Sequence, residues 1–179
     1  MAVVLGKSGV ITNMETVPVV HSEAAKANAT LKQATGTVEL ANGDSIGSVY
    51  KMCRIPSNAI VRRVLLYCDA ITSGIADIGC YYAQPSRQGG AIASATTGLV
   101  AVDLDVFATA QAISAALSVG TDVTYEATAA NIDKVETALW SLCGLTADPF
   151  VDFDVCLTLT AATTAAGTVS LAVQYTDNR

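Results

Sequence analysis

The amino-acid sequence predicts an all-β protein: an antiparallel sandwich with one short helix and an extended N-terminal arm. Short segments of alternating apolar and polar residues recur from residue 36 onward, and turn-forming residues separate them. Alanine, threonine, valine and serine are abundant, and β-branched residues favour strands. At 179 residues the chain is long enough for one domain with its own core and short for two. We therefore expect an arm at residues 1–35 and a sandwich domain at residues 36–179.

The first 35 residues carry no sustained helix or strand period. They contain the single histidine, His21, and the small, polar stretch SEAAKANATLKQATG, where we expect one helical turn near residues 23–27. Lys7 lies within the opening apolar residues rather than before them, so we do not expect a signal peptide. Because the five cysteines are interpreted as buried free thiols, we expect folding in a reducing cytoplasm.

Regular strand signals begin after the arm. Strands are predicted at residues 37–40, 46–55 and 59–70, and we interpret the last two as a hairpin joined by the turn Pro56-Ser57-Asn58. Val61 and Leu65 place apolar groups on the outer face of the third strand, which indicates that something packs there.

The middle of the chain continues the strand pattern. Residues 77–82 alternate, the turn-rich residues 84–98 are typical of an exposed loop, and residues 99–107 alternate again before a stretch in which we expect short strands. One helix is predicted where Asp133 and Glu136 have capping-box spacing, Val135, Leu139 and Leu142 share a face, and Gly144 can end the helix. Trp140 is expected to anchor this helix to the sheet.

Two strands are predicted at the end of the chain, at residues 151–159 and 169–175. The charge-free run between Asp154 and Asp177 is long enough to span a membrane, but it alternates with period two and is rich in threonine. It is therefore interpreted as two strands and a turn. About eight antiparallel strands indicate a sandwich of the jelly-roll type.

Composition excludes several classes of function. A net charge of −6 argues against nucleic-acid binding, which needs a basic face. Gly6-Lys7-Ser8 lacks the earlier glycine of a phosphate-binding loop, and a single histidine leaves no basis for zinc or nucleophilic catalysis. The five cysteines have no C-x-x-C spacing and are expected to be buried thiols, with a disulfide as the alternative. We therefore predict no catalytic residue, metal or cofactor.

Two pairs of aspartates leave another possibility open. Asp103 with Asp105, and Asp152 with Asp154, are each predicted on the solvent side of a strand. Such pairs can bind calcium or act as acid and base, although outward charges on strands usually maintain solubility.

Four basic residues flank the predicted hairpin turn: Lys51, Arg54, Arg62 and Arg63. On paired strands they would form one basic patch on an acidic molecule. The alternatives are a solvated hairpin end and a docking patch for an acidic protein surface.

Four segments of the sequence carry a resemblance to a known family: SIGSVYKMCRIPSNAIV, ADIGCYY, ALWSLCGL before ADP, and FDVCLTLTAATTAAGTVSLAVQY. Their order resembles that of capsid decoration, or cement, proteins of tailed bacteriophages, over about residues 36–178. The arm matches through GKSGVITNMET. The resemblance implies a jelly roll, present in many copies on the outside of an icosahedral head, that clamps neighbouring major capsid subunits. It implies no enzyme and no cofactor.

Partners follow from the resemblance together with the composition. We expect the major capsid protein and further copies of this chain, as a homodimer or homotrimer, and neither nucleic acid nor membrane. The predicted interface residues are Lys7, Ile11, Met14, Lys51, Arg54, Arg62, Arg63 and Arg87.

The rival hypotheses are a tail-associated or receptor-binding carbohydrate-binding jelly roll and a β-sandwich enzyme that uses the aspartate pairs. Sugar sites need exposed aromatic faces, and Tyr81, Tyr82 and Tyr125 are the candidates.

Overall fold

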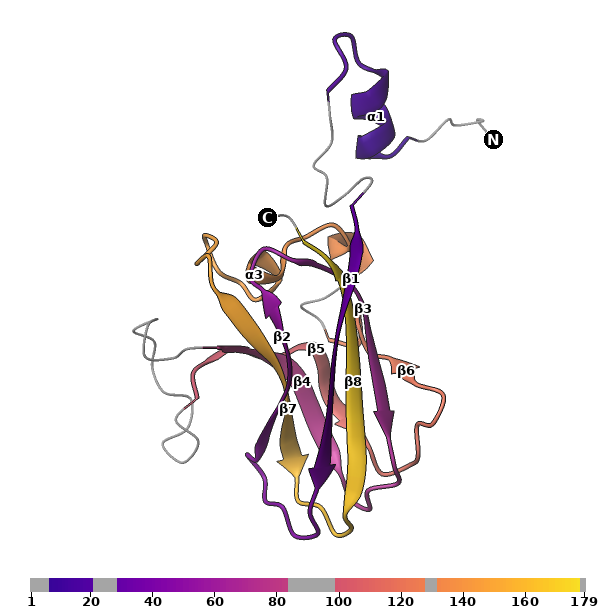
Figure 1. Cartoon of the computed structure of the whole chain (residues 1–179), viewed down its shortest axis with the longest axis vertical. Coiled ribbons are helices and arrows are strands. Elements are labelled where there is room, and N and C mark those ends of the chain that lie inside the picture. Colours follow the sequence, from indigo (N-terminus) through magenta and orange to yellow (C-terminus); the bar gives the residue numbers. More distant parts are fainter. Residues whose placement is uncertain (1–6, 21–28, 84–98, 128–131, 178–179) are drawn as a thin grey trace, which may run out of the picture.

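Two four-stranded antiparallel sheets packed face to face form the body of the protein (Figure 1). The computed structural model describes residues 7–20, 29–83, 99–127 and 132–177. The strands are β1 (Leu31–Leu40), β2 (Val49–Pro56), β3 (Ile60–Cys68), β4 (Ile75–Tyr82), β5 (Ala101–Ala112), β6 (Thr121–Asp122), β7 (Asp152–Ala161) and β8 (Gly167–Thr176). The helical elements are α1 (Gly9–Glu15), the 3-10 helix η2 (Ile132–Lys134) and α3 (Leu139–Leu142).

The strand order identifies the architecture. Sheet A has the order β1-β8-β3-β6 and sheet B the order β2-β7-β4-β5. Every connection between consecutive strands passes from one sheet to the other, except that from β4 to β5. This is the arrangement of an eight-stranded jelly roll, so the predicted fold class is confirmed.

The core lies between the two sheets. As predicted, alternate residues of β7 and β8 are fully buried, among them Phe153, Val155, Val169 and Leu171. All neighbouring strands pair antiparallel, and the charge-free C-terminal run forms β7, a turn and β8. In the described part of the chain, no helix is long and apolar enough to cross a membrane.

The predicted hairpin around Pro56-Ser57-Asn58 is wrong in one respect. The turn exists, with the Ala59 N–H donating to the Pro56 carbonyl at 3.1 Å. However, β2 pairs with β7 in sheet B, whereas β3 pairs with β8 in sheet A. The turn is therefore a corner between the two sheets, because each strand finds its partner in a distant part of the chain.

The β2 strand departs from strict alternation. Its register against β7 shifts between Lys51 and Cys53. A bulge of this kind adds one residue to one strand and changes which side chains share a face. Met52 and Ile55 are consequently both buried, while Lys51 and Arg54 both bond to Asp154 on the opposite face of the strand.

The predicted helix is shorter than its capping box suggested. The α-helix begins at Leu139, and residues 132–134 form only a 3-10 turn. Ala138 is extended and has no side-chain cap; instead the Leu139 and Trp140 N–H groups donate to the carbonyls of Ala59 and Ser57, at 2.8 and 2.9 Å. Bonds to the corner between the sheets thus replace the local cap, and Val135 is 41% exposed rather than packed on the helix face.

Other parts of that prediction are confirmed. Leu139 and Leu142 are buried, and Trp140 packs against the core. Gly144 has a φ of 74°, the left-handed conformation that commonly follows a helix.

The N-terminal segment contains structure that the sequence pattern did not predict. Helix α1 begins after Ser8, whose hydroxyl accepts a hydrogen bond from the Ile11 N–H at 3.3 Å. Strand β1 starts at Leu31, within the segment expected to be arm. The helical turn expected at residues 23–27 lies outside the described residues.

The two sheets meet closely where β1 crosses β2. A Cβ added at Gly36 would lie 1.7 Å from the Met52 carbonyl oxygen. At this point the backbone of one edge strand rests on the backbone of the other, and only glycine leaves room. Gly79 serves a similar purpose in sheet B, where an added Cβ would lie 2.2 Å from the Leu104 backbone beside an irregular stretch of β5.

We predict that Gly36→Ala lowers the free energy of unfolding by about 3 kcal/mol or more, because the clash involves backbone atoms on both strands. Urea denaturation measures the loss. Gly43→Ala is the matched control: Gly43 has a φ of 90° but nothing within 4 Å, so it should cost only about 1–2 kcal/mol. Equal losses for the two variants would contradict the assigned role of Gly36.

Candidate functional site

Helix α1 of the arm lies beyond one end of the sandwich (Figure 1), and the arm carries exposed apolar side chains. The exposed fractions are 43% for Ile11, 97% for Val17, 55% for Val19 and 50% for Val20. Such a run is unusual at a protein surface and marks a segment that can pack against a partner. Of the predicted interface residues, Lys7 lies just before α1 and pairs with Glu15, the last residue of the helix, and Met14 belongs to the same helix.

Lys51 and Arg54 converge on one buried carboxylate. The Lys51 ammonium lies 2.9 Å and the Arg54 guanidinium 2.6 Å from Asp154, whose side chain is 4% exposed. Burial alone would raise the pKa of Asp154, but the hydrogen bonds from Arg54 and Lys51 outweigh burial and hold this pKa below its ordinary value. Asp154 was predicted to face solvent, so that placement is wrong.

Arg62 and Arg63 belong to the other sheet. The Arg63 guanidinium pairs with Asp122 at 2.9 Å, and Arg62 donates to the Val135 carbonyl at 3.3 Å. The four basic residues therefore do not lie on one pair of bonded strands, which removes the basis for a single basic patch. Arg87 lies outside the described residues.

An exposed aromatic side chain that the sequence analysis missed lies near the corner between the sheets. Phe150 is 82% exposed and has a φ of 53°, which is rare for a bulky residue. Asp148 accepts hydrogen bonds from the Phe150 N–H and the Ser57 hydroxyl, at 2.9 and 2.5 Å, and so ties this loop to the corner. The Asp-Pro-Phe sequence after the helix was the available signal.

The tyrosines expected to contact a sugar are poorly placed for that role. Tyr81 is 2% exposed, and its hydroxyl bonds Thr158. Tyr82 packs edge-on against Phe153, with ring centroids 5.6 Å apart, and the Tyr125 hydroxyl is buried. Tyr81 is buried and Tyr82 and Tyr125 are partly buried, so none of the three is a fully exposed ring of the kind a sugar platform needs.

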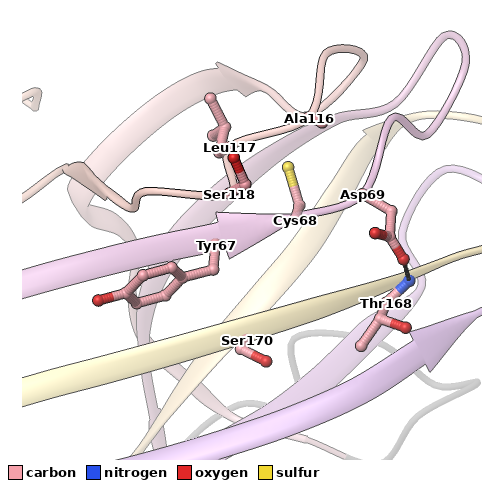
Figure 2. Close-up of a pocket in the computed structure, with 8 residues that line it drawn as sticks. All are labelled: Tyr67, Cys68, Asp69, Ala116, Leu117, Ser118, Thr168 and Ser170. Carbon is pink, nitrogen blue, oxygen red and sulfur yellow. Dashed lines mark hydrogen bonds between the residues drawn. The ribbon is translucent and has the colours of Figure 1, made fainter.

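A shallow pocket of about 190 Å³ lies instead on the outer face of sheet A (Figure 2). Its walls come from the end of β3, the start of β8 and the loop before β6. The lining residues are Tyr67, Cys68, Asp69, Ala116, Leu117, Ser118, Thr168 and Ser170. As Figure 2 shows, the Asp69 carboxylate accepts a hydrogen bond from the Thr168 N–H, at 3.0 Å.

The described residues offer no clear site for metal binding or for thiol chemistry. The described residues contain no group of three or more histidine, cysteine, aspartate or glutamate side chains that could hold a metal ion. All five cysteines are free, and four are buried. Burial raises the pKa of Cys53 and that of Cys156 to about 12, so both thiols stay protonated at neutral pH. His21 lies outside the described residues.

Comparisons with known proteins give matches only at the level of structure. No protein-family model and no curated protein sequence matches the chain. One chain of the cyanophage Pam1 capsid asymmetric unit superposes with a TM-score of 0.52 and 16% identity, over 83% of this chain and 85% of that chain. One chain of the capsid of Ralstonia phage GP4 superposes with a TM-score of 0.55 and 13% identity, over 83% and 84%. At these identities the likeness establishes a shared fold.

We predict that Asp154→Asn lowers the free energy of unfolding at pH 7 by about 1–3 kcal/mol, since a buried carboxylate loses charge-assisted hydrogen bonds. The folded-state pKa of Asp154 lies below that of the unfolded chain. Its contribution is therefore present above pH of about 3.9 and is lost as the pH falls through the folded-state pKa.

Urea denaturation between pH 7 and pH 3 measures how the contribution of Asp154 to the free energy of unfolding depends on pH. The difference between wild type and Asp154→Asn should shrink toward pH 3. Asp133→Asn, at an exposed position, is the control and should change the free energy of unfolding at pH 7 by less than about 0.5 kcal/mol. Parallel pH profiles for wild type and Asp154→Asn would contradict the prediction.

Proposed function

We propose that this chain is a non-enzymatic structural protein of a phage virion, which binds the outer surface of an icosahedral head and stabilises contacts between major capsid subunits. The observation that carries the proposal is the shared jelly roll. Two chains from phage capsid structures match it over 83% of this chain and at least 84% of their own length. The order of the sequence segments, which resembles that of capsid decoration proteins, agrees with this match.

The arm supports the same proposal on physical grounds. Val17, Val19 and Val20 are at least half exposed, although leaving aliphatic side chains in water is unfavourable. A capsid surface would bury them, and Ile11 on α1 extends the same apolar segment. The major capsid protein is thus the proposed partner for the arm, in the host cytoplasm during assembly and on the outside of the finished head.

Phe150 gives the sandwich end a second contact point. An aromatic side chain held by a braced loop loses little entropy on binding, which is typical of interface hot spots. Arg62 and Arg63 lie on β3 in the other sheet and remain proposed interface residues, as do Lys51, Arg54 and Arg87. A dimer or trimer of the chain would engage several capsid subunits at once and gain from the high effective concentration.

A tail-associated receptor-binding role receives less support. Its predicted contacts, Tyr81, Tyr82 and Tyr125, do not form an exposed platform. The enzyme alternative loses one of its aspartate pairs, because Asp154 is engaged by two cations.

We predict that replacing Val17, Val19 and Val20 by serine weakens attachment to expanded, empty heads that lack this protein. Co-sedimentation and counting of copies per head measure attachment. The loss of three exposed valines from a contact should reduce affinity at least tenfold, since about 1.4 kcal/mol corresponds to a factor of ten. Wild-type protein should saturate at a copy number related to the icosahedral symmetry.

The matched control is Ile46→Ser with Val119→Ser, at exposed apolar positions in loops at the other end of the sandwich. This double variant should bind like wild type. If wild-type protein does not bind heads at micromolar concentration, the proposed function is wrong. If it binds and the arm variant binds equally, the arm is not the docking segment.

A further inference from the structure

The pocket on sheet A lies at the end of the sandwich opposite the arm. Leu31, where the chain leaves the arm, pairs with Thr176, the last residue of β8. The pocket residues Thr168 and Ser170 lie near the start of the same strand. Ser170 and Thr176 are six positions apart along the strand, or about 20 Å at about 3.4 Å per residue. A surface that covers the arm end would therefore leave the pocket open.

The walls of the pocket are held in place before any ligand binds. The Leu117 N–H donates to the Cys68 carbonyl at 2.8 Å, which joins the loop to the end of β3. Gly120, with a φ of 78°, lies against the Tyr67 ring so closely that an added Cβ would be 2.6 Å from it. The ring is thus braced on one side by backbone, and a braced aromatic ring is a suitable stacking surface.

The lining also contains several hydroxyl groups and the Asp69 carboxylate. Thr168 donates from its hydroxyl to Glu39 at 2.7 Å, and Ser170 shares a hydrogen bond of 2.7 Å with Thr37 on β1. Within the described residues, the hydroxyls of Tyr67 and Ser118 have no hydrogen-bond partner. The pocket therefore offers two unused hydroxyls and several acceptors beside an apolar ring and the Leu117 side chain.

The lining excludes several ligand classes. None of its eight residues is lysine, arginine or histidine, so phosphates and carboxylates find no counter-charge, and Asp69 and Glu39 repel them. Burial raises the pKa of the Cys68 thiol, which argues against a thiolate metal ligand. About 190 Å³ is smaller than the pockets of about 300–1,000 Å³ that hold drug-sized molecules. A small, uncharged ligand with one apolar face and many hydroxyls fits these limits.

We infer that this pocket binds one ring of a neutral sugar, a hexopyranose or N-acetylhexosamine. The C–H face of the sugar stacks on Tyr67, and its hydroxyls exchange hydrogen bonds with Ser118 and Ser170. This activity is separate from attachment to a head, because it uses the opposite end of the sandwich. On a virion it would give each copy a weak contact with surface glycans, strengthened by the number of copies.

Saturation-transfer NMR on the full chain tests the inference, with methyl glycosides of neutral hexoses and N-acetylhexosamines as probes at about 10 mM, well above a dissociation constant of about 1 mM. Glucuronic acid and sialic acid are the anionic comparisons. We expect transfer to at least one neutral sugar and none to the acids. Tyr67→Ala should weaken binding about tenfold, while Tyr67→Phe, which keeps the ring, should lose less.

Matched variants separate the pocket from the rest of the loop. Ser118→Ala should weaken binding severalfold, whereas Ser114→Ala, an exposed serine in the same loop outside the lining, should bind like wild type. Thermal unfolding confirms that each variant is folded. No transfer to any neutral sugar, or transfer that Tyr67→Ala and Ser118→Ala both leave unchanged, would overturn the inference. Co-sedimentation of Tyr67→Ala with heads should match wild type. A negative result for sugar binding therefore does not bear on the proposed function.

Discussion

The fold depends on two central strands that come last in the chain. Strands β1 and β3 pair with β8, and β2 and β4 pair with β7. Neither sheet has its centre until residues 152–176 are in place, so most of the stabilising contacts join distant parts of the sequence. Lys32 and Asp177, for example, form an ion pair across a separation of 145 residues. Folding of such a topology is expected to be slow compared with that of a helical protein.

Several charged side chains of the described residues pair with one another within the molecule. Although the net charge is −6, the basic residues near the corner are engaged by neighbouring groups, and Asp154 alone binds Lys51 and Arg54. Pairing with a buried carboxylate holds these two cations at sheet B and limits their use as free docking groups. Contacts with a partner would therefore draw chiefly on the exposed valines of the arm and on Phe150.

The two ends of the sandwich differ in chemistry. One end has the apolar arm and, beside the corner between the sheets, the braced Phe150. The other end has a small pocket lined by hydroxyls and an acidic group. The proposed attachment to a head and the inferred sugar contact use opposite ends, so neither would block the other.

The sequence by itself determined where most strands lie, which residues of β7 and β8 face the core, and that the chain forms a jelly roll, because alternation and turn residues are local signals. The tertiary structure alone decided that β2 and β3 separate into different sheets, that a bulge brings Lys51 and Arg54 to Asp154, and that Tyr67 forms a pocket with a distant loop. The physical reason is that a local pattern specifies which way a side chain points, whereas its neighbours are set by strand pairing across more than a hundred residues.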